Sequence, residues 1–143
     1  MKNIFLLFVF FLVIGVVGVF FFQRDKDVTE ESPFVLVVPT GVEHTMMYGD
    51  DGYIPSSLSI AAGDTVIFQN ISSKSTWPAS NAHPTHTIYP GSGIQKCGGG
   101  EVIFDACGAI APGQEWKFIF TEQGKWRYHN HMRPSMQGII IVE

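Results

Sequence analysis

EWKFIFTEQGKWRYHNH, residues 115–131, is the stretch that indicates the fold most directly. In its first half, Trp116, Phe118 and Phe120 fall on every second position. Successive side chains of a β-strand point to opposite faces, so this spacing places the three aromatic side chains on one face. We therefore predict a strand over residues 115–120, with its aromatic face toward a core.

The second half of the stretch continues the alternation after a turn that contains Gly124. One face of this second predicted strand carries Trp126, Tyr128 and Asn130. The opposite face carries Arg127, His129 and His131. The two histidines are therefore expected to point the same way.

Short runs of β-forming residues recur from Phe34 onward, separated by turn residues. No stretch there shows a helical period longer than a turn or two. Residues 46–53, MMYGDDGY, are expected to form a loop that packs on the strands. Strands of about five residues with frequent turns indicate an all-β sandwich or barrel. The predicted strands are residues 34–38, 58–70 with the turn AAGD inside it, 85–90, 101–104, 115–120, 125–129 and 138–142.

The chain has 143 residues, of which 45% are hydrophobic, and this suits one domain of ordinary size. It has 9 Lys and Arg residues and a formal net charge of -4 at pH 7. A protein with so few cations has no basic surface that could follow phosphates. Nucleic acid is therefore not expected as a partner.

Residues 4–22 form an apolar segment with no charged or polar side chain. A helix of roughly 19 residues would reach about 28 Å, close to the hydrocarbon thickness of a bilayer. A cleaved signal peptide is the alternative, but the apolar core is longer than usual and no small-residue cleavage signal follows it. We expect a single-pass membrane anchor at residues 1–23, a polar linker at 24–33 and one folded domain at 34–143.

Cys97 and Cys107 are the only two cysteines, and they flank a Gly-rich segment, CGGGEVIFDAC. An extracytoplasmic location would let them pair, and closing a loop of about eleven residues would stabilise the fold by about 3 kcal/mol on the chain-entropy model. Two unrelated thiols, or one cysteine acting as a metal thiolate, are the alternatives. A disulfide between them would indicate a domain on the extracytoplasmic side of the membrane, which is the location that we expect.

Four of the five histidines fall in two short motifs, HPTH at residues 83–86 and HNH at residues 129–131. A metal needs several neutral imidazoles from different parts of the chain, and side chains at i and i+2 of a strand reach the same side of a sheet. Ordinary exposed or hydrogen-bonded histidines are the alternative. The candidate metal ligands are His86, His129 and His131, with His83 and Met136 as nearby candidates.

Imidazole and thioether donors favour copper over magnesium, calcium or manganese. Zinc is the alternative, because three histidines and a water form a common catalytic zinc site. Met136 taken alone is more typical of a packing residue, since methionine often fills gaps in cores.

Three longer stretches resemble cupredoxins: YIPSSLSIAAGDTVIFQNISS at residues 53–73, HPTHTIYP at 83–90 and IAPGQEWKFIFTEQGKWRYHNHMRPSMQGIIIV at 110–142. The resemblance covers nearly all of the chain after about residue 50. It implies a Greek-key β-sandwich that holds copper between a loop histidine and a cluster near the last two strands. This expectation agrees with the all-β prediction, and it makes copper the expected cofactor.

The last loop departs from the pattern of small blue copper proteins. When it is aligned on Pro134, Met136 and Gly138, Asn130 stands at the cysteine position and Arg133 at the histidine position. The copper–thiolate bond gives a blue site its colour and helps to define its geometry. The resemblance therefore implies a pale, histidine-rich, type 2-like site.

The same loop is more similar to the final domain of multicopper oxidases, although Asn130 again replaces a cysteine and Ser135 replaces a histidine. HPTH resembles an HPxHxH motif of these oxidases, with Ile88 in place of the third histidine. The two resemblances disagree on the loop ligand, which is His86 in one and His83 in the other. His86 is preferred because it opens the β-type run HTIY.

Three functions are compatible with these patterns. The preferred one is a membrane-anchored, extracytoplasmic copper-binding cupredoxin that transfers electrons or handles copper, with a redox or copper-delivery protein as its partner. The second is a metal-free cupredoxin-like binding module at the cell surface. The third is a one-domain enzyme related to multicopper oxidases and completed by neighbouring subunits. One chain has too few histidine motifs for that enzyme, so a binding protein or electron carrier is favoured over an enzyme.

Overall fold

The computed structural model describes residues 41–143. The expected membrane anchor, the linker and the predicted strand at 34–38 lie outside the described residues. Within residues 41–143, none of the helical structure is long and apolar enough to cross a membrane. The elements are β1 (Glu43–Gly49), β2 (Gly52–Ile54), β3 (Ser57–Ile60), β4 (Thr65–Asn70), β5 (Pro78–Ser80), the 3-10 helix η1 (Ile94–Lys96), β6 (Glu115–Ile119), β7 (Gly124–Asn130) and β8 (Arg133–Val142).

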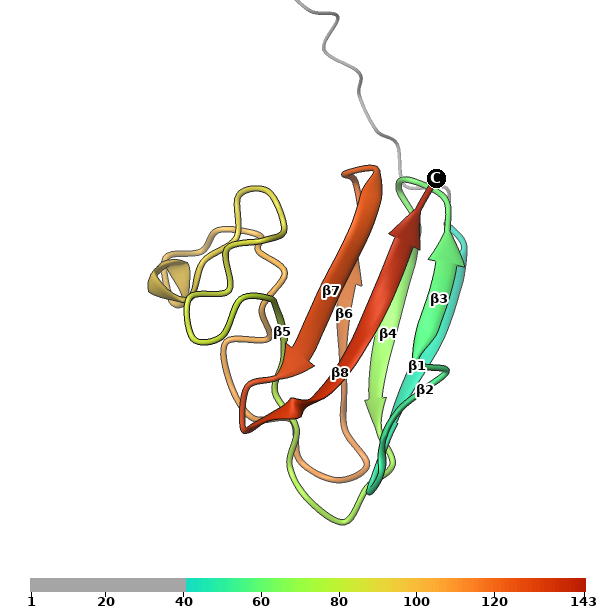
Figure 1. The fold of residues 1–143 in the computed structure, drawn as a ribbon, viewed down its shortest axis with the longest axis vertical. Coiled ribbons are helices and arrows are strands. Elements are labelled where there is room, and N and C mark those ends of the chain that lie inside the picture. Colours follow the sequence, from blue (N-terminus) through green and yellow to red (C-terminus); the bar gives the residue numbers. More distant parts are fainter. Residues whose placement is uncertain (1–40) are drawn as a thin grey trace, which may run out of the picture. The chain divides into compact units, whose positions relative to one another are not determined.

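The strands form two four-stranded sheets, one in the order β2-β1-β4-β6 and the other in the order β3-β8-β7-β5. Both sheets are mixed. β1 runs parallel to β4 and β3 runs parallel to β8, whereas the other neighbours are antiparallel. Figure 1 shows β7 and β8 lying over β6 and β4. The prediction of an all-β sandwich is confirmed for the described part of the chain.

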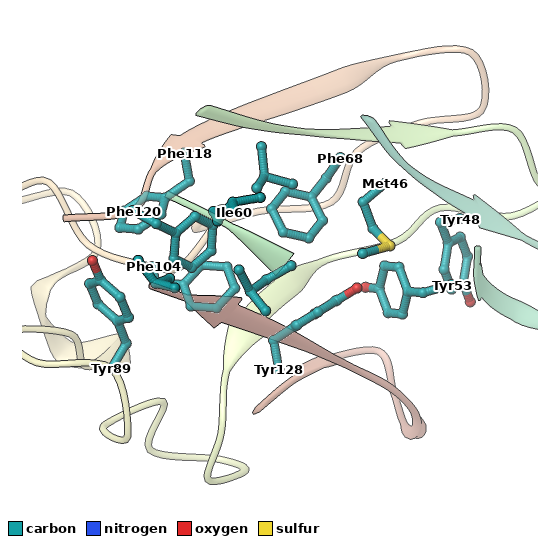
Figure 2. Packing of buried hydrophobic residues seen from close by; sticks show 13 residues of the cluster. Met46, Tyr48, Tyr53, Ile60, Phe68, Tyr89, Phe104, Phe118, Phe120 and Tyr128 are labelled. Carbon is teal, nitrogen blue, oxygen red and sulfur yellow. The ribbon is translucent and has the colours of Figure 1, made fainter. Parts of the chain in front are cut away.

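Aromatic side chains fill the space between the two sheets, as Figure 2 shows. Phe118 and Phe120 are buried in this core and Trp116 packs against it, which confirms the predicted shared face of residues 115–120. Tyr128 of β7 is buried in the same cluster. Pairs of aromatic rings in edge or tilted contact add about 0.5–1.5 kcal/mol each beyond the buried area.

Gly138 of β8 leaves room for the ring of Tyr128, its partner on β7. A methyl group on Gly138 would overlap that ring. Gly138→Ala is therefore expected to lower the free energy of unfolding by about 1–3 kcal/mol, as overpacking of a core does. Denaturation of the metal-free chain followed by tryptophan fluorescence measures the change. Gly108→Ala is the matched control, because the added methyl group there meets nothing within 4 Å. Equal stability of the two variants would contradict the prediction.

Two predicted strands, residues 85–90 and 101–104, are not strands, and that prediction is wrong. Both segments belong to the long connection between β5 and β6. Tyr89 and Phe104 are buried in the core cluster, whereas Val102 is 87% exposed. The apolar residues of these segments therefore anchor the connection to the core instead of forming a sheet.

The expected loop at residues 46–53 is also wrong, because most of this segment belongs to β1 and β2. β1 pairs in parallel with β4, and its side chains Met46 and Tyr48 are buried. Asp50 and Asp51 form the turn that leads into β2. The turn residues in the middle of the segment concealed its short alternating runs. The three-residue strand β5 was not predicted either.

Candidate metal centre

The two histidine motifs meet on the face of β7 that points away from the core. His83 and His86 lie in the connection after β5, His129 is in β7 and His131 follows that strand. One ring nitrogen from each residue lies within 4.8 Å of those of the other three. The structure thus brings together all four histidines of the HPTH and HNH motifs.

The four rings form two close pairs around a common small volume. Nδ1 of His83 lies 3.3 Å from Nε2 of His129, and Nε2 of His86 lies 2.9 Å from Nδ1 of His131. Without a metal, each pair can share one proton in a hydrogen bond. When His83 and His131 carry their ring proton on Nε2 instead, four nitrogen lone pairs face one another. Such a set suits copper or zinc, which bind imidazole well.

Two polar side chains orient the inner rings. Nδ1 of His86 donates a hydrogen bond to the Asp105 carboxylate at 2.5 Å, and Nδ1 of His129 donates to the side-chain oxygen of Asn81 at 2.9 Å. Each bond places the ring proton on Nδ1 and leaves the Nε2 lone pair facing the other histidines. Metal-binding histidines usually have such a partner on the second nitrogen, which fixes both tautomer and ring orientation.

Asp105 is buried, and it joins several parts of the site. Besides the bond from His86, its carboxylate accepts a hydrogen bond from Nε1 of Trp77 at 2.6 Å and one from the backbone N–H of Cys107 at 2.7 Å. The Trp77 ring also packs against His131, with their ring centroids 4.5 Å apart. One carboxylate therefore ties the start of β5 and the HPTH loop to the segment around Cys107.

The backbone brings the two motifs to one place. β5 pairs with the end of β7, where Ala79 lies opposite His129, and the N–H of His131 donates to the carbonyl of Trp77 at 2.7 Å. The N–H of His86 donates to the carbonyl of Ala82 at 2.7 Å. His86 has a φ of 59°, a left-handed conformation that is uncommon for a residue with a side chain. This turn replaces the β-type run expected from HTIY.

Burial lowers the pKa of two histidines of the cluster, His129 and His131. His86 is 0% and His129 is 1% exposed, whereas His83 is at the surface. Burial is the largest cause that lowers the pKa of His129 to about 4, and the neighbouring rings of His86 and His83 lower it further. Burial also lowers the pKa of His131. Neutral imidazole is the form that binds a metal, so these ligands need not lose a proton at neutral pH.

The metal-free protein is expected to lose stability in mild acid. The pKa of His129 is about 4 in the folded chain, below its ordinary value of about 6.5 in the unfolded chain. Between these values the unfolded chain binds more protons, so acid favours unfolding. We expect the free energy of unfolding to fall by about 2 kcal/mol from pH 6.5 to pH 4, measured by denaturation at several pH values. His129→Gln should show a smaller fall. A stability that is constant or rises toward pH 4 would contradict the prediction.

Solved structures with a similar backbone identify the fold. A purple cupredoxin from Nitrosopumilus maritimus aligns with a TM-score of 0.53 and 20% identity, over 69% of this chain and 98% of its own. A reduced mutant of amicyanin aligns with a TM-score of 0.52 and 21% identity, over 71% of this chain and 82% of its own. This chain has the cupredoxin fold.

A copper-containing nitrite reductase from Thermus scotoductus SA-01 also aligns, with a TM-score of 0.54 and 20% identity. That alignment covers 71% of this chain and 22% of the reductase chain. No protein-family profile matches the sequence, and no curated protein matches it. The likeness to cupredoxins is therefore one of fold, which confirms the fold implied by the sequence resemblance.

In this cupredoxin fold, Asn130 faces the core on the side of β7 opposite to His129. Its side-chain oxygen accepts hydrogen bonds from the backbone N–H groups of Trp77 and Met132, each at 3.0 Å. Its amide donates to the hydroxyl of Tyr48 at 2.9 Å. Asn130, which the sequence resemblance aligns with the blue-copper cysteine, therefore holds two loop segments and β1 together.

Met136 does not lie with the four histidines. It is next to Gln137, which pairs with His129 across the sheet, and alternation therefore points Met136 to the other face. Its side chain packs against the hydrophobic core, and its sulfur lies beside Gly52. This placement agrees with a packing role.

Cys97 and Cys107 form a disulfide, with their Cα atoms 5.3 Å apart. The predicted pairing is confirmed, and the alternatives of free thiols or a metal thiolate are wrong. The bridge closes a loop that contains Asp105, two residues before Cys107. It therefore restrains the segment that orients His86.

Sequence reasoning did not identify Asp105, Asn81 or Trp77 as parts of the site. Local signals point to two of these three residues. Asp105 is the only charged residue in the run VIFDAC, and Asn81 stands two residues before the HPTH motif. Neither signal shows which histidine Asp105 or Asn81 contacts.

Asp105→Asn is expected to weaken metal binding by about 10–100-fold, the usual cost of losing a partner that orients a ligand. Both carboxylate oxygens accept hydrogen bonds, one from His86 and the other from Trp77 and Cys107. The new amide NH2 group would face a donor in either orientation. Competition with a copper chelator measures the affinity, and Asp51→Asn on the exposed turn is the matched control. Equal affinities of the two variants would contradict the orienting role of Asp105.

Proposed function

We propose that the chain is a copper-binding cupredoxin in which His83, His86, His129 and His131 hold one copper ion. One observation carries the proposal: four ring nitrogens of one chain converge within 4.8 Å. Copper(II) binds nitrogen donors more tightly than the other common divalent metals, zinc included. Two structures with a similar fold, a purple cupredoxin and a copper-containing nitrite reductase, support the same metal.

The residues of the chain favour a pale, type 2-like centre. His86 and His129 would bind through Nε2, because Asp105 and Asn81 hold their Nδ1 protons. His83 and His131 would bind through Nδ1, the nitrogen that faces the cluster. With Asn130 in the core and the cysteines paired, no thiolate joins this set among residues 41–143.

Electron transfer is the use that we propose for the site. Copper supplies one-electron chemistry when it is bound. His86 and His129 are buried and oriented, which keeps the site in one arrangement, while exposed His83 gives the centre an edge at the surface. Copper handling is the second candidate, because displacement of the same exposed His83 would open the site for release.

The proposal also includes the membrane anchor and an extracytoplasmic domain. The apolar residues 4–22 support the anchor, and the disulfide between Cys97 and Cys107 supports an oxidising compartment. Protease treatment of intact cells that express the full chain tests both points. The domain should stay with the membrane fraction and be cut from outside. A soluble or protected domain would contradict this part of the proposal.

Repeated redox cycling of the copper-loaded full chain in detergent tests the electron-transfer role. The chain should be reduced and reoxidised over many cycles, with its copper retained in the presence of a Cu(I) chelator. Loss of copper to the chelator on each reduction would overturn electron transfer in favour of copper handling. His83→Ala, which opens the exposed side of the site, should lose copper faster than the unchanged chain.

A further inference from the structure

A hollow lies beside the histidine cluster, on the same outer face of the sheet β3-β8-β7-β5. It is lined by Asn81, Ala82, Ile88, Lys125, Arg127 and Ile139. Ala82 is next to His83 in the chain, and Asn81 is the partner of His129. The hollow and the candidate metal centre are therefore adjacent, and Asn81 and Ala82 lie between them.

The two cations of the hollow, Lys125 and Arg127, lie on the same face of β7 as the candidate metal ligand His129. Lys125, Arg127 and His129 follow one another at every second position of β7, so they lie on one face. The intervening residues, Trp126 and Tyr128, face the core. Arg127 is therefore the neighbour of His129 on this face of the strand.

Both cations of the hollow are exposed. No carboxylate among residues 41–143 forms an ion pair with Lys125 or Arg127. Lys117 pairs with Glu43 and Lys96 with Glu101, whereas Lys74 and Arg133, like the two cations of the hollow, form no ion pair within residues 41–143. Lys125 and Arg127 differ from Lys74 and Arg133 in that they lie together on one strand face and line the same hollow.

The rest of the lining is apolar. Ile139 stands opposite Arg127 on β8, and Ile88, which also lines the hollow, is 51% exposed. Exposed isoleucine beside positive charge suits a ligand with an apolar body and an anionic end. Ligand sites in general combine an apolar lining with a few polar groups that fix orientation.

We propose that this hollow binds a small organic carboxylate. Arg127 and Lys125 hold the carboxylate by charge-assisted hydrogen bonds, and Ile88, Ala82 and Ile139 contact its apolar body. Binding needs no metal, so the site stands or falls independently of the proposed copper centre. With copper bound, the ligand would lie next to His83 and His129.

Binding of 3-phenylpropionate to the metal-free full chain, in a nonionic detergent, tests the proposal. Nuclear magnetic resonance of the labelled chain should show saturable shifts at Arg127, Ile88 and Ile139. The neutral 3-phenylpropanamide should bind at least about tenfold more weakly, because it lacks the charge that the cations recognise. Acetate should also bind more weakly, because it has no apolar body.

Substitutions of single cations distinguish binding in the hollow from general attraction of the carboxylate to any surface cation. Arg127→Gln and Lys125→Gln should each weaken 3-phenylpropionate binding by about tenfold, the effect of losing one charge-assisted hydrogen bond. Lys74→Gln, which removes an exposed cation from another part of the surface, should leave it unchanged. The proposal is overturned if no saturable shifts occur, if the amide or acetate binds as well as the acid, or if all three variants behave alike.

Discussion

Replacing His86 with alanine is expected to weaken Cu(II) binding by more than about 100-fold, because even residues that only orient a ligand contribute 10–100-fold. His86 is buried in the centre of the cluster, with its Nε2 facing His131 and its Nδ1 held by Asp105. Its removal takes away one nitrogen donor and leaves the Asp105 carboxylate without its histidine partner. Competition titration against a Cu(II) chelator of known affinity measures the loss.

Two further variants keep this prediction falsifiable if His86→Ala folds poorly. His83→Ala removes an exposed ring and should fold normally while still weakening copper binding. His44→Ala is the matched control, because His44 lies outside the cluster, with its Nε2 2.8 Å from the Asp64 carboxylate. If His83→Ala and His86→Ala bind copper as tightly as His44→Ala, the four-histidine site is wrong.

Removal of the disulfide by Cys97→Ser together with Cys107→Ser is expected to lower the free energy of unfolding by about 3 kcal/mol. The bridge joins residues 10 positions apart and so restricts the unfolded chain. Copper affinity should fall as well, because the backbone N–H of Cys107 bonds to the carboxylate that orients His86. Chemical denaturation of the metal-free chain and copper competition measure the two effects.

A reducing agent provides the control for this prediction. It should bring the unchanged chain close to the stability of the double variant, and it should leave the double variant itself unaffected. A double variant that is as stable as the oxidised chain, or that binds copper equally well, would show that the bridge does not support the site.

Alternation in the sequence predicted the parts of the fold in which the strand pattern is local. The shared face of Trp116, Phe118 and Phe120 needs only neighbouring residues, and it agrees with the core. Alternation did not predict the structure of the connection between β5 and β6. Tyr89 and Phe104 look like strand residues, yet they are apolar because they anchor a loop.

The candidate site was predictable where its residues carry their own chemistry. Four histidines in two tight motifs indicated metal binding, and the structure brings all four together. The orienting partners depend on contacts between segments distant in sequence, such as His129 with Asn81, which are 48 positions apart. No local pattern encodes such a contact. The position of Met136 could not be predicted for the same reason. Only the pairing of β7 with β8 shows which face of the sheet its side chain lies on.

Electron paramagnetic resonance of the Cu(II)-loaded full chain, recorded with metal stoichiometry and visible absorption, is the decisive test of copper binding by the four histidines. We predict one copper ion per chain, nitrogen hyperfine structure from imidazole ligands, a pale type 2-like spectrum, and loss of that signal in His86→Ala but not in His44→Ala. A chain that retains no copper, or one with the intense blue absorption of a thiolate ligand, would contradict a copper centre built from these four histidines.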